Sequence, residues 1–142
     1  MIFVKDKGNQ DAKVIDATNA PLGRLASVVA KRLLKGEKIT IINASNAIIT
    51  GSPQFTKNKY QERRARGSPQ HGPFFPRGTE GILRRAIRGM LPRKKASGRE
   101  AFRRLIVHLG SAGLEGESFA KEIRTRYITL KELSREIGGK GD

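Results

Sequence analysis

The sequence contains no cysteine and no tryptophan. The absence of cysteine excludes structural disulfides, thiolate metal sites, cysteine nucleophiles and thiol redox chemistry. No apolar run approaches the roughly 20 residues that a membrane-spanning helix needs. The first ten residues, MIFVKDKGNQ, also lack the apolar stretch and the cleavage site of a secretory signal. We therefore expect a cytoplasmic protein with no membrane partner.

Acidic residues are scarce, with 13 Asp and Glu against 29 Lys and Arg in 142 residues. The sequence offers no paired carboxylates for acid–base catalysis or for two-metal chemistry. His71 and His108 lie far apart, without a carboxylate at the spacing of a metal site or a catalytic triad. We read His108 as a strand residue without a catalytic role. The sequence thus predicts no enzyme, no metal site, no cofactor and no small-molecule substrate.

The excess positive charge is concentrated in the middle of the chain. Residues 1–55 carry 8 basic and 4 acidic side chains, residues 56–110 carry 15 and 3, and residues 111–142 carry 6 and 6. Arginine supplies 11 of the 15 middle cations, and its planar guanidinium grips two phosphate oxygens at once. A solvated cationic face is the alternative, but this density favours a nucleic-acid partner.

The first third of the chain reads as strand, helix, strand. Residues 13–17 and 38–43 are short apolar strand patterns. Between them, apolar residues recur at helical spacing, and Gly36 stands where a left-handed helix cap is expected. Thr18 or Asn19 is the candidate N-cap, with Pro21 in the first turn. Such a unit predicts two parallel strands joined by a crossover helix.

The rest of the chain alternates polar helices with loops. Residues 47–50 fit either a short strand or a helical turn. Further along, we predict a helix-compatible segment at 53–64, an extended basic loop at 63–78, helices at 79–91, 99–104 and 130–137, a strand at 105–109, and a loose linker at 111–118. In the 79–91 helix, Arg84, Arg85 and Arg88 share one face, and the apolar residues, Met90 among them, occupy the other. Because these apolar residues are needed to cover a sheet, a membrane-surface helix is disfavoured and RNA is the better partner.

Two short segments admit more than one reading. The APLGR turn at 20–24 lacks the glycines of a dinucleotide loop. We therefore favour a helix start packed tightly at Gly23 over a single-phosphate contact by the helix N-terminus and Arg24. In the basic loop, Phe74 and Phe75 are able either to stack on bases or to anchor the loop. We favour anchoring for one of them and leave the other open.

Five segments together closely resemble the universal L-thirteen family of large-subunit ribosomal proteins. They are NAPLGRLAS (19–27), INASNAIITG (42–51), HGPFFPR (71–77), RRAIRGMLPRKKASGREAFRRL (84–105) and VHLG (107–110). The loop and the short length favour the archaeal type. The resemblance implies an α/β fold, a three-layer α/β/α core around a four-stranded parallel sheet. It also implies contacts with large-subunit ribosomal RNA and neighbouring ribosomal proteins, and an early role in assembly.

We expect a single domain over residues 1–142, with its core at about 13–110, a basic extended loop, and a C-terminal extension at 111–142. We hypothesise one phosphate-binding stripe on the 79–91 helix, a second along 93–104, and an arm from Arg63 to Arg77 threaded between RNA helices. The predicted RNA-binding residues are Lys57, Lys59, Arg63, Arg64, Arg66, His71, Arg77, Arg84, Arg85, Arg88, Arg93, Lys94, Lys95, Arg99, Arg103 and Arg104. The alternatives are a free-standing RNA-binding regulatory protein and, less favoured, an enzyme that processes nucleic acid.

Overall fold

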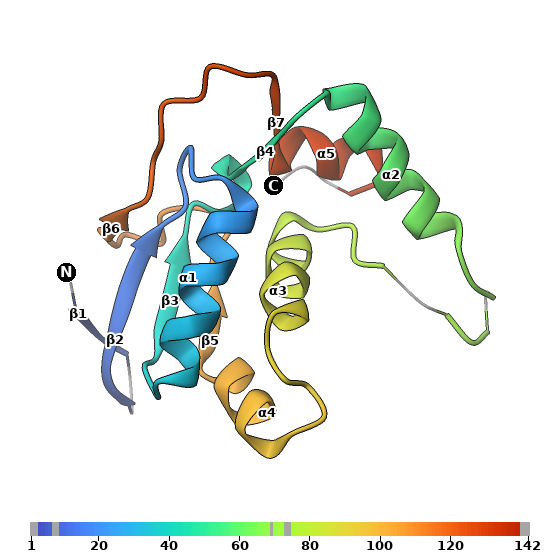
Figure 1. The fold of residues 1–142 in the computed structure, drawn as a ribbon. Helices are drawn as coiled ribbons and strands as arrows, with labels where there is room; N and C mark the ends of the chain where they lie inside the picture. Colours follow the sequence, from blue (N-terminus) through green and yellow to red (C-terminus); the bar gives the residue numbers. More distant parts are fainter. Residues whose placement is uncertain (1–2, 7–8, 69, 73–74, 140–142) are drawn as a thin grey trace.

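The computed structural model describes residues 3–6, 9–68, 70–72 and 75–139, with side chains from residue 12 onward. Its main sheet has four parallel strands in the order β6 (Glu117–Ser118), β2 (Asn9–Asp16), β3 (Ile39–Ile42) and β5 (Leu105–Val107). β1 (Phe3–Asp6) adds to β2 in the antiparallel direction. The predicted α/β class with a four-stranded parallel sheet flanked by helices is confirmed, and the arrangement is consistent with three α/β/α layers. Figure 1 shows α1 (Leu22–Leu34) crossing one face of this sheet, in front of β3.

The helices pack around this sheet and around a second, smaller one. The second sheet pairs β4 (Ile48–Thr50) with β7 (Tyr127–Thr129) in the antiparallel direction, which settles residues 47–50 as a strand outside the main sheet. The helices are α1 (Leu22–Leu34), the 3-10 turn η1 (Ala44–Asn46), α2 (Pro53–Ala65), α3 (Thr79–Gly89), α4 (Ala96–Arg103) and α5 (Leu130–Glu136). No helix within the described residues is both long and apolar enough to cross a membrane.

The predicted crossover helix is α1, and its apolar stripe carries the core. Leu25, Val29 and Leu33 are buried on one side of α1 and belong to the same hydrophobic cluster as Ile39 and Ile41 of β3. The β2–β3 pair is parallel, as predicted. Alternate residues of β3 face α1 because successive side chains of a strand point to opposite sides. α1 and β3 therefore pack against each other through one continuous apolar layer.

The predicted cap of α1 is wrong. Pro21 occupies the N-cap position without a side-chain hydrogen bond. Thr18 instead donates from its backbone nitrogen and its hydroxyl to the Asp16 carboxylate, at 2.9 and 2.7 Å. Asn19 takes a left-handed conformation with φ of 55°. Both candidate N-caps, Thr18 and Asn19, therefore belong to the turn after β2 rather than to the start of the helix. Gly36 has φ of 95°, which confirms the predicted left-handed end.

Several boundaries differ from the predicted ones around the basic region. α3 ends at Gly89 rather than at residue 91, and Met90 of its predicted apolar face is 46% exposed. α4 starts at Ala96, three residues earlier than predicted. β5 ends at Val107, and the predicted strand residue His108 follows it directly.

The chain beyond residue 110 returns to the body. Residues 117–118, predicted as part of a loose linker, form β6 and pair with Ile15 and Asp16 of β2. Leu130 and Leu133 of α5 are completely buried and belong to the central hydrophobic cluster. The core therefore extends past the predicted limit near residue 110. A short apolar pattern such as that of α5 does not by itself reveal which surface will cover it.

Candidate nucleic-acid interface

Phe75 organises the basic region. Its half-buried ring packs edge-on against Tyr60 of α2, with ring centroids 5.5 Å apart. The guanidinium carbon of Arg85 lies 5.2 Å from the centre of the Phe75 ring, and that of Arg63 lies 5.9 Å away. Arg64 donates a hydrogen bond to the Phe75 carbonyl at 2.8 Å. Phe75 therefore anchors the loop between α2 and α3, as predicted for one phenylalanine, while Phe74 lies outside the described residues.

The predicted arm from Arg63 to Arg77 starts later than expected. Arg63 and Arg64 belong to the last turn of α2, and the helix ends before Arg66. The pKa of Arg64 is lowered by burial and by the positive charge of Arg77. Like charges raise each other's free energy unless an anion lies between them. The two ends of the loop thus bring the guanidinium groups of Arg64 and Arg77 together, and neither forms an ion pair with a carboxylate among the described residues.

A second group of like charges joins α3 to the basic turn that follows it. The pKa of Arg88 is lowered by burial and by the nearby positive charges of Arg93 and Arg85. Arg85 also faces Phe75, so the two groups are continuous through that ring. We call Arg63, Arg64, Arg77, Arg85, Arg88 and Arg93 the arginine cluster. It draws on α2, the loop, α3 and the turn after α3.

Unlike Arg64 of the cluster, which donates to a carbonyl of the loop, Arg84 and Arg104 donate to carbonyls of β5 and α1. Arg84 lies over the ring of Phe102 at 4.8 Å and donates to the Leu105 carbonyl at 3.3 Å. Arg104 donates to the Leu33 carbonyl at 2.5 Å, at the last turn of α1. Both guanidinium groups satisfy backbone carbonyls, and each ties one element to another. The structure therefore separates Arg84 from Arg85 and Arg88, with which the helical wheel had grouped it.

The turn after α3 and the start of α4 carry the most exposed positive charges. Arg93, Lys94, Lys95, Arg99 and Arg103 are all exposed. Arg99 donates to the Lys94 carbonyl at 3.3 Å, which supports the turn without using an acidic partner. This group continues the arginine cluster from Arg93 along α4.

The outer side of α2 is more mixed. Lys57 forms an ion pair with Glu136 at 3.3 Å, and Arg66 forms one with Glu62 at 2.7 Å. Lys59 is exposed, as is His71 in the loop. Sequence reasoning missed Phe55, which is 67% exposed and lines an open pocket of about 530 Å³ with Lys59 and Arg66 among others. An apolar residue amid polar helix positions is the signal that would have found it.

Electrostatic compensation is sparse in this region. Within the described part of the chain, ion pairs engage Lys57 and Arg66 but no other predicted RNA-binding residue. Exposed charges normally gain little from pairing, yet a cluster of several guanidiniums without acids creates a strongly positive field. Planar donors in that field suit phosphate groups. The arrangement provides a surface for a polyanion rather than a reaction centre.

The predicted close packing at Gly23 is wrong. Gly23 is exposed, and a Cβ atom placed on it would meet no atom within 4 Å. The helix start therefore needs no glycine for packing.

Comparison with known proteins identifies the family. The model of the family described as Ribosomal protein L13 matches residues 10–113. Proteins named large ribosomal subunit protein uL13 are 50% identical in Methanopyrus kandleri, over 88% of this chain and 86% of the relative, and 48% identical in Methanocaldococcus jannaschii, over 89% and 98%. A third, from Archaeoglobus fulgidus, is 45% identical over 92% of this chain and 90% of its own. These archaeal relatives agree with the expected type, and the chain belongs to the ribosomal protein L13 family.

Proposed function

We propose that this protein is a structural constituent of the large ribosomal subunit and binds ribosomal RNA without catalysing a reaction. The observation that carries the proposal is the arginine cluster, in which guanidiniums from four segments lie together and form no ion pair with any acidic residue that the structure describes. The relatives' name, large ribosomal subunit protein, supports the ribosomal address. The protein would act in the cytoplasmic ribosome, as one domain, beside neighbouring ribosomal proteins.

The arginine cluster would bind phosphates, whereas Arg84 and Arg104 would hold the surface in shape through their bonds to backbone carbonyls. Phosphate contacts position a protein without reading base sequence, and side chains do not enter the narrow major groove of A-form RNA. Specificity would therefore come from matching the fixed positions of α2, α3 and α4 to a folded RNA. We assign direct contacts to the cluster and to Lys59, Lys94, Lys95, Arg99 and Arg103, with Lys57, Arg66 and His71 at the margin. Arg84 and Arg104 act as positioning residues.

Neutralising the cluster tests this function. The triple variant Arg85→Gln, Arg88→Gln, Arg93→Gln removes three cations, and Lys31→Gln, Lys35→Gln, Lys131→Gln removes three exposed cations elsewhere. Binding to purified large-subunit RNA should weaken far more in the first variant. The slope of log affinity against log salt should fall by roughly 0.7 to 0.9 for each phosphate that the protein no longer neutralises. Equal affinities and slopes in the two variants would refute the assignment.

A free-standing RNA-binding regulator is the alternative with the same surface. Sedimentation of cell extract separates the two functions, because a ribosomal constituent travels almost entirely with large subunits. A protein found mostly at the top of the gradient would favour the regulator.

A further inference from the structure

A second basic site surrounds the first turn of α1, in an open pocket of about 750 Å³. Arg24 of α1 and Thr50 of β4 line it. Residues 119–126, which we call the strap, add Lys121 and Arg124 to the lining. Three cations from segments about 100 residues apart in sequence thus line one pocket. Counting charge along the sequence hides this site, because residues 111–142 are neutral as a whole.

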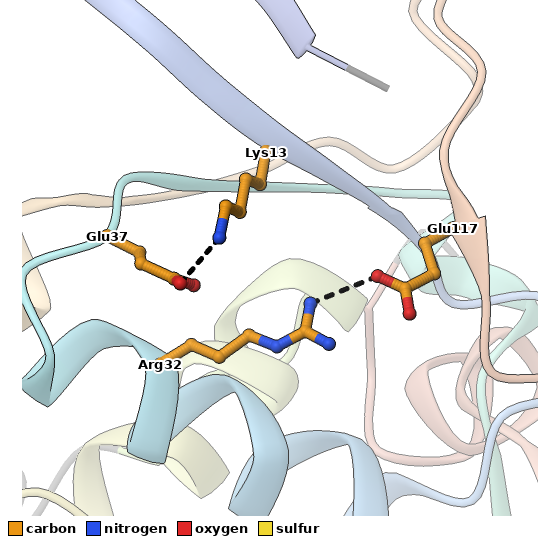
Figure 2. A network of polar contacts seen from close by, with 4 residues as sticks. All are labelled: Lys13, Arg32, Glu37 and Glu117. Atoms are coloured by element: carbon orange, nitrogen blue, oxygen red, sulfur yellow. Dashed lines mark hydrogen bonds and ion pairs between the residues drawn. The ribbon is translucent and has the colours of Figure 1, made fainter. Parts of the chain in front are cut away.

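The strap is held at both ends. At its start, Glu117 of β6 forms an ion pair with Arg32 of α1 at 3.1 Å, and the Arg32 guanidinium carbon lies 5.5 Å from the centre of the Phe119 ring. Figure 2 shows Arg32 reaching from α1 to Glu117, beside the separate ion pair of Lys13 with Glu37. At its end, Gly51 donates to the Arg126 carbonyl at 2.8 Å, next to the β4–β7 pair.

The middle of the strap is fixed against the turn after β2. The Lys121 backbone nitrogen donates to the Asn19 carbonyl at 3.3 Å. Lys121 is thus held by its backbone at the turn while it lines the pocket. The strap therefore holds Lys121 and Arg124 beside Arg24 before any ligand arrives, which lowers the conformational cost of binding.

The charge of the pocket points to an anion. Within the described residues, Arg24, Lys121 and Arg124 form no ion pair. Glu122 is the one acidic residue that lines the pocket, and it is exposed. Thr50 and Thr125 add hydroxyl groups to the lining. Guanidinium, ammonium and hydroxyl donors together suit the oxygens of successive phosphodiester groups.

The pocket and the basic turn lie at opposite ends of α1. Arg104 bonds to the Leu33 carbonyl near the C-terminal end of that helix, whereas Arg24 stands in its first turn. A helix of 13 residues is about 20 Å long at 1.5 Å per residue. Figure 1 shows α4 at one end of α1 and the strap passing the other. An RNA contact at α4 and one at the pocket would therefore lie about 20 Å apart, one length of α1.

We propose that the pocket formed by Arg24, Lys121 and Arg124 binds the phosphodiester backbone of a second RNA segment, distinct from the one on the arginine cluster. The proposal rests on the ribosomal RNA-binding function proposed above and extends it. The protein would then hold two RNA segments at a fixed separation, with α1 as the spacer. This gives the C-terminal part of the chain, neutral in total, a direct RNA-binding role.

Neutralising the pocket is the first test. Arg24→Gln, Lys121→Gln, Arg124→Gln is compared with the Lys31, Lys35, Lys131 control variant, which loses the same charge. On purified large-subunit RNA, the salt slope of the pocket variant should fall by roughly 0.7 to 0.9 for each phosphate that the pocket no longer binds, while the control keeps a steeper slope. If both variants behave alike, the pocket contributes only long-range charge and the proposal is wrong.

Directed RNA cleavage is the second test, and it leaves the three cations in place. Because the chain has no cysteine, Glu122→Cys and Ser97→Cys each create one attachment point for an iron chelate that generates hydroxyl radicals. Both positions are exposed, Glu122 at the pocket and Ser97 on α4. In complexes with large-subunit RNA, the two probes should cut different RNA segments. No cleavage from position 122, or cleavage at the same nucleotides as from position 97, would overturn the proposal.

These outcomes are separable from failure of the proposed function. If the wild-type chain does not bind large-subunit RNA, or if the arginine-cluster variant binds like its control, the proposed function fails. If the cluster variant loses binding while the pocket variant matches its control, only the second site fails. If an acidic protein segment occupies the pocket instead of RNA, the pocket variant should bind RNA like its control, and only the second site fails.

Discussion

Substituting Gly98 with alanine should destabilise the protein, although Gly98 lies in α4. In an exposed helix interior, replacing glycine with alanine usually stabilises by roughly 0.5 to 1 kcal/mol. Here a Cβ atom would lie 2.5 Å from the Pro92 carbonyl carbon and closer still to its oxygen. A backbone carbonyl has no rotamer into which it can retreat. The same oxygen accepts the hydrogen bond from the Lys95 nitrogen at 3.0 Å, so the basic turn must move with it.

The expected size follows from these opposing effects. Overpacking costs about 1 to 3 kcal/mol and loss of the turn hydrogen bond about 0.5 to 1.5 kcal/mol, against a helix gain of up to about 1 kcal/mol. We expect Gly98→Ala to lower the free energy of unfolding by roughly 0.5 to 4 kcal/mol. RNA affinity should fall as well, because Lys94 and Lys95 are displaced with the turn.

Urea unfolding followed by circular dichroism measures the effect, with Gly89→Ala as the matched control. Gly89 ends α3, is exposed, and has open space where a Cβ would lie. The control should be unchanged or slightly more stable. If Gly98→Ala is as stable as the control, the close approach of α4 to Pro92 is not a constraint and the reasoning is refuted.

Two further predictions concern the core and pH. Leu133→Ala should cost about 2 to 5 kcal/mol of unfolding free energy, since Leu133 is fully buried; the exposed Lys131→Ala is the control, and equal midpoints in urea would exclude a core role for α5. Burial tends to raise the pKa of Asp16, but hydrogen bonds from Thr18 and Asn43 outweigh it and leave that pKa lowered. A lowered pKa stabilises the fold above the ordinary value of about 3.9, and this contribution disappears as pH falls through the folded value. Asp16→Asn should therefore cost stability at pH 7 and little near about pH 2, and a pH-independent cost would contradict this.

Local periodic signals were readable without the structure. The stripe of Leu25, Val29 and Leu33 predicted α1 because a helix completes one turn every 3.6 residues, so residues four apart lie on the same face. Caps and ends were less predictable, since Thr18 turns to Asp16 rather than to the helix. The candidate site divides in the same way. Its cationic composition is visible in the sequence, but the distinction between Arg85 on Phe75 and Arg84 on Phe102 is not.

The sequence by itself determined the α/β pattern and the excess of arginine, and it favoured an RNA partner, because all three follow from composition and short-range spacing. Tertiary structure decided which cations bond to backbone carbonyls of the protein and how the residues after 110 pack against the core. It also decided that Arg24, Lys121 and Arg124 line one pocket. Such contacts join residues far apart in the chain, as Arg32 and Glu117 show across 85 positions. Contacts of this kind leave no periodic trace in the sequence, so only the folded chain reveals them.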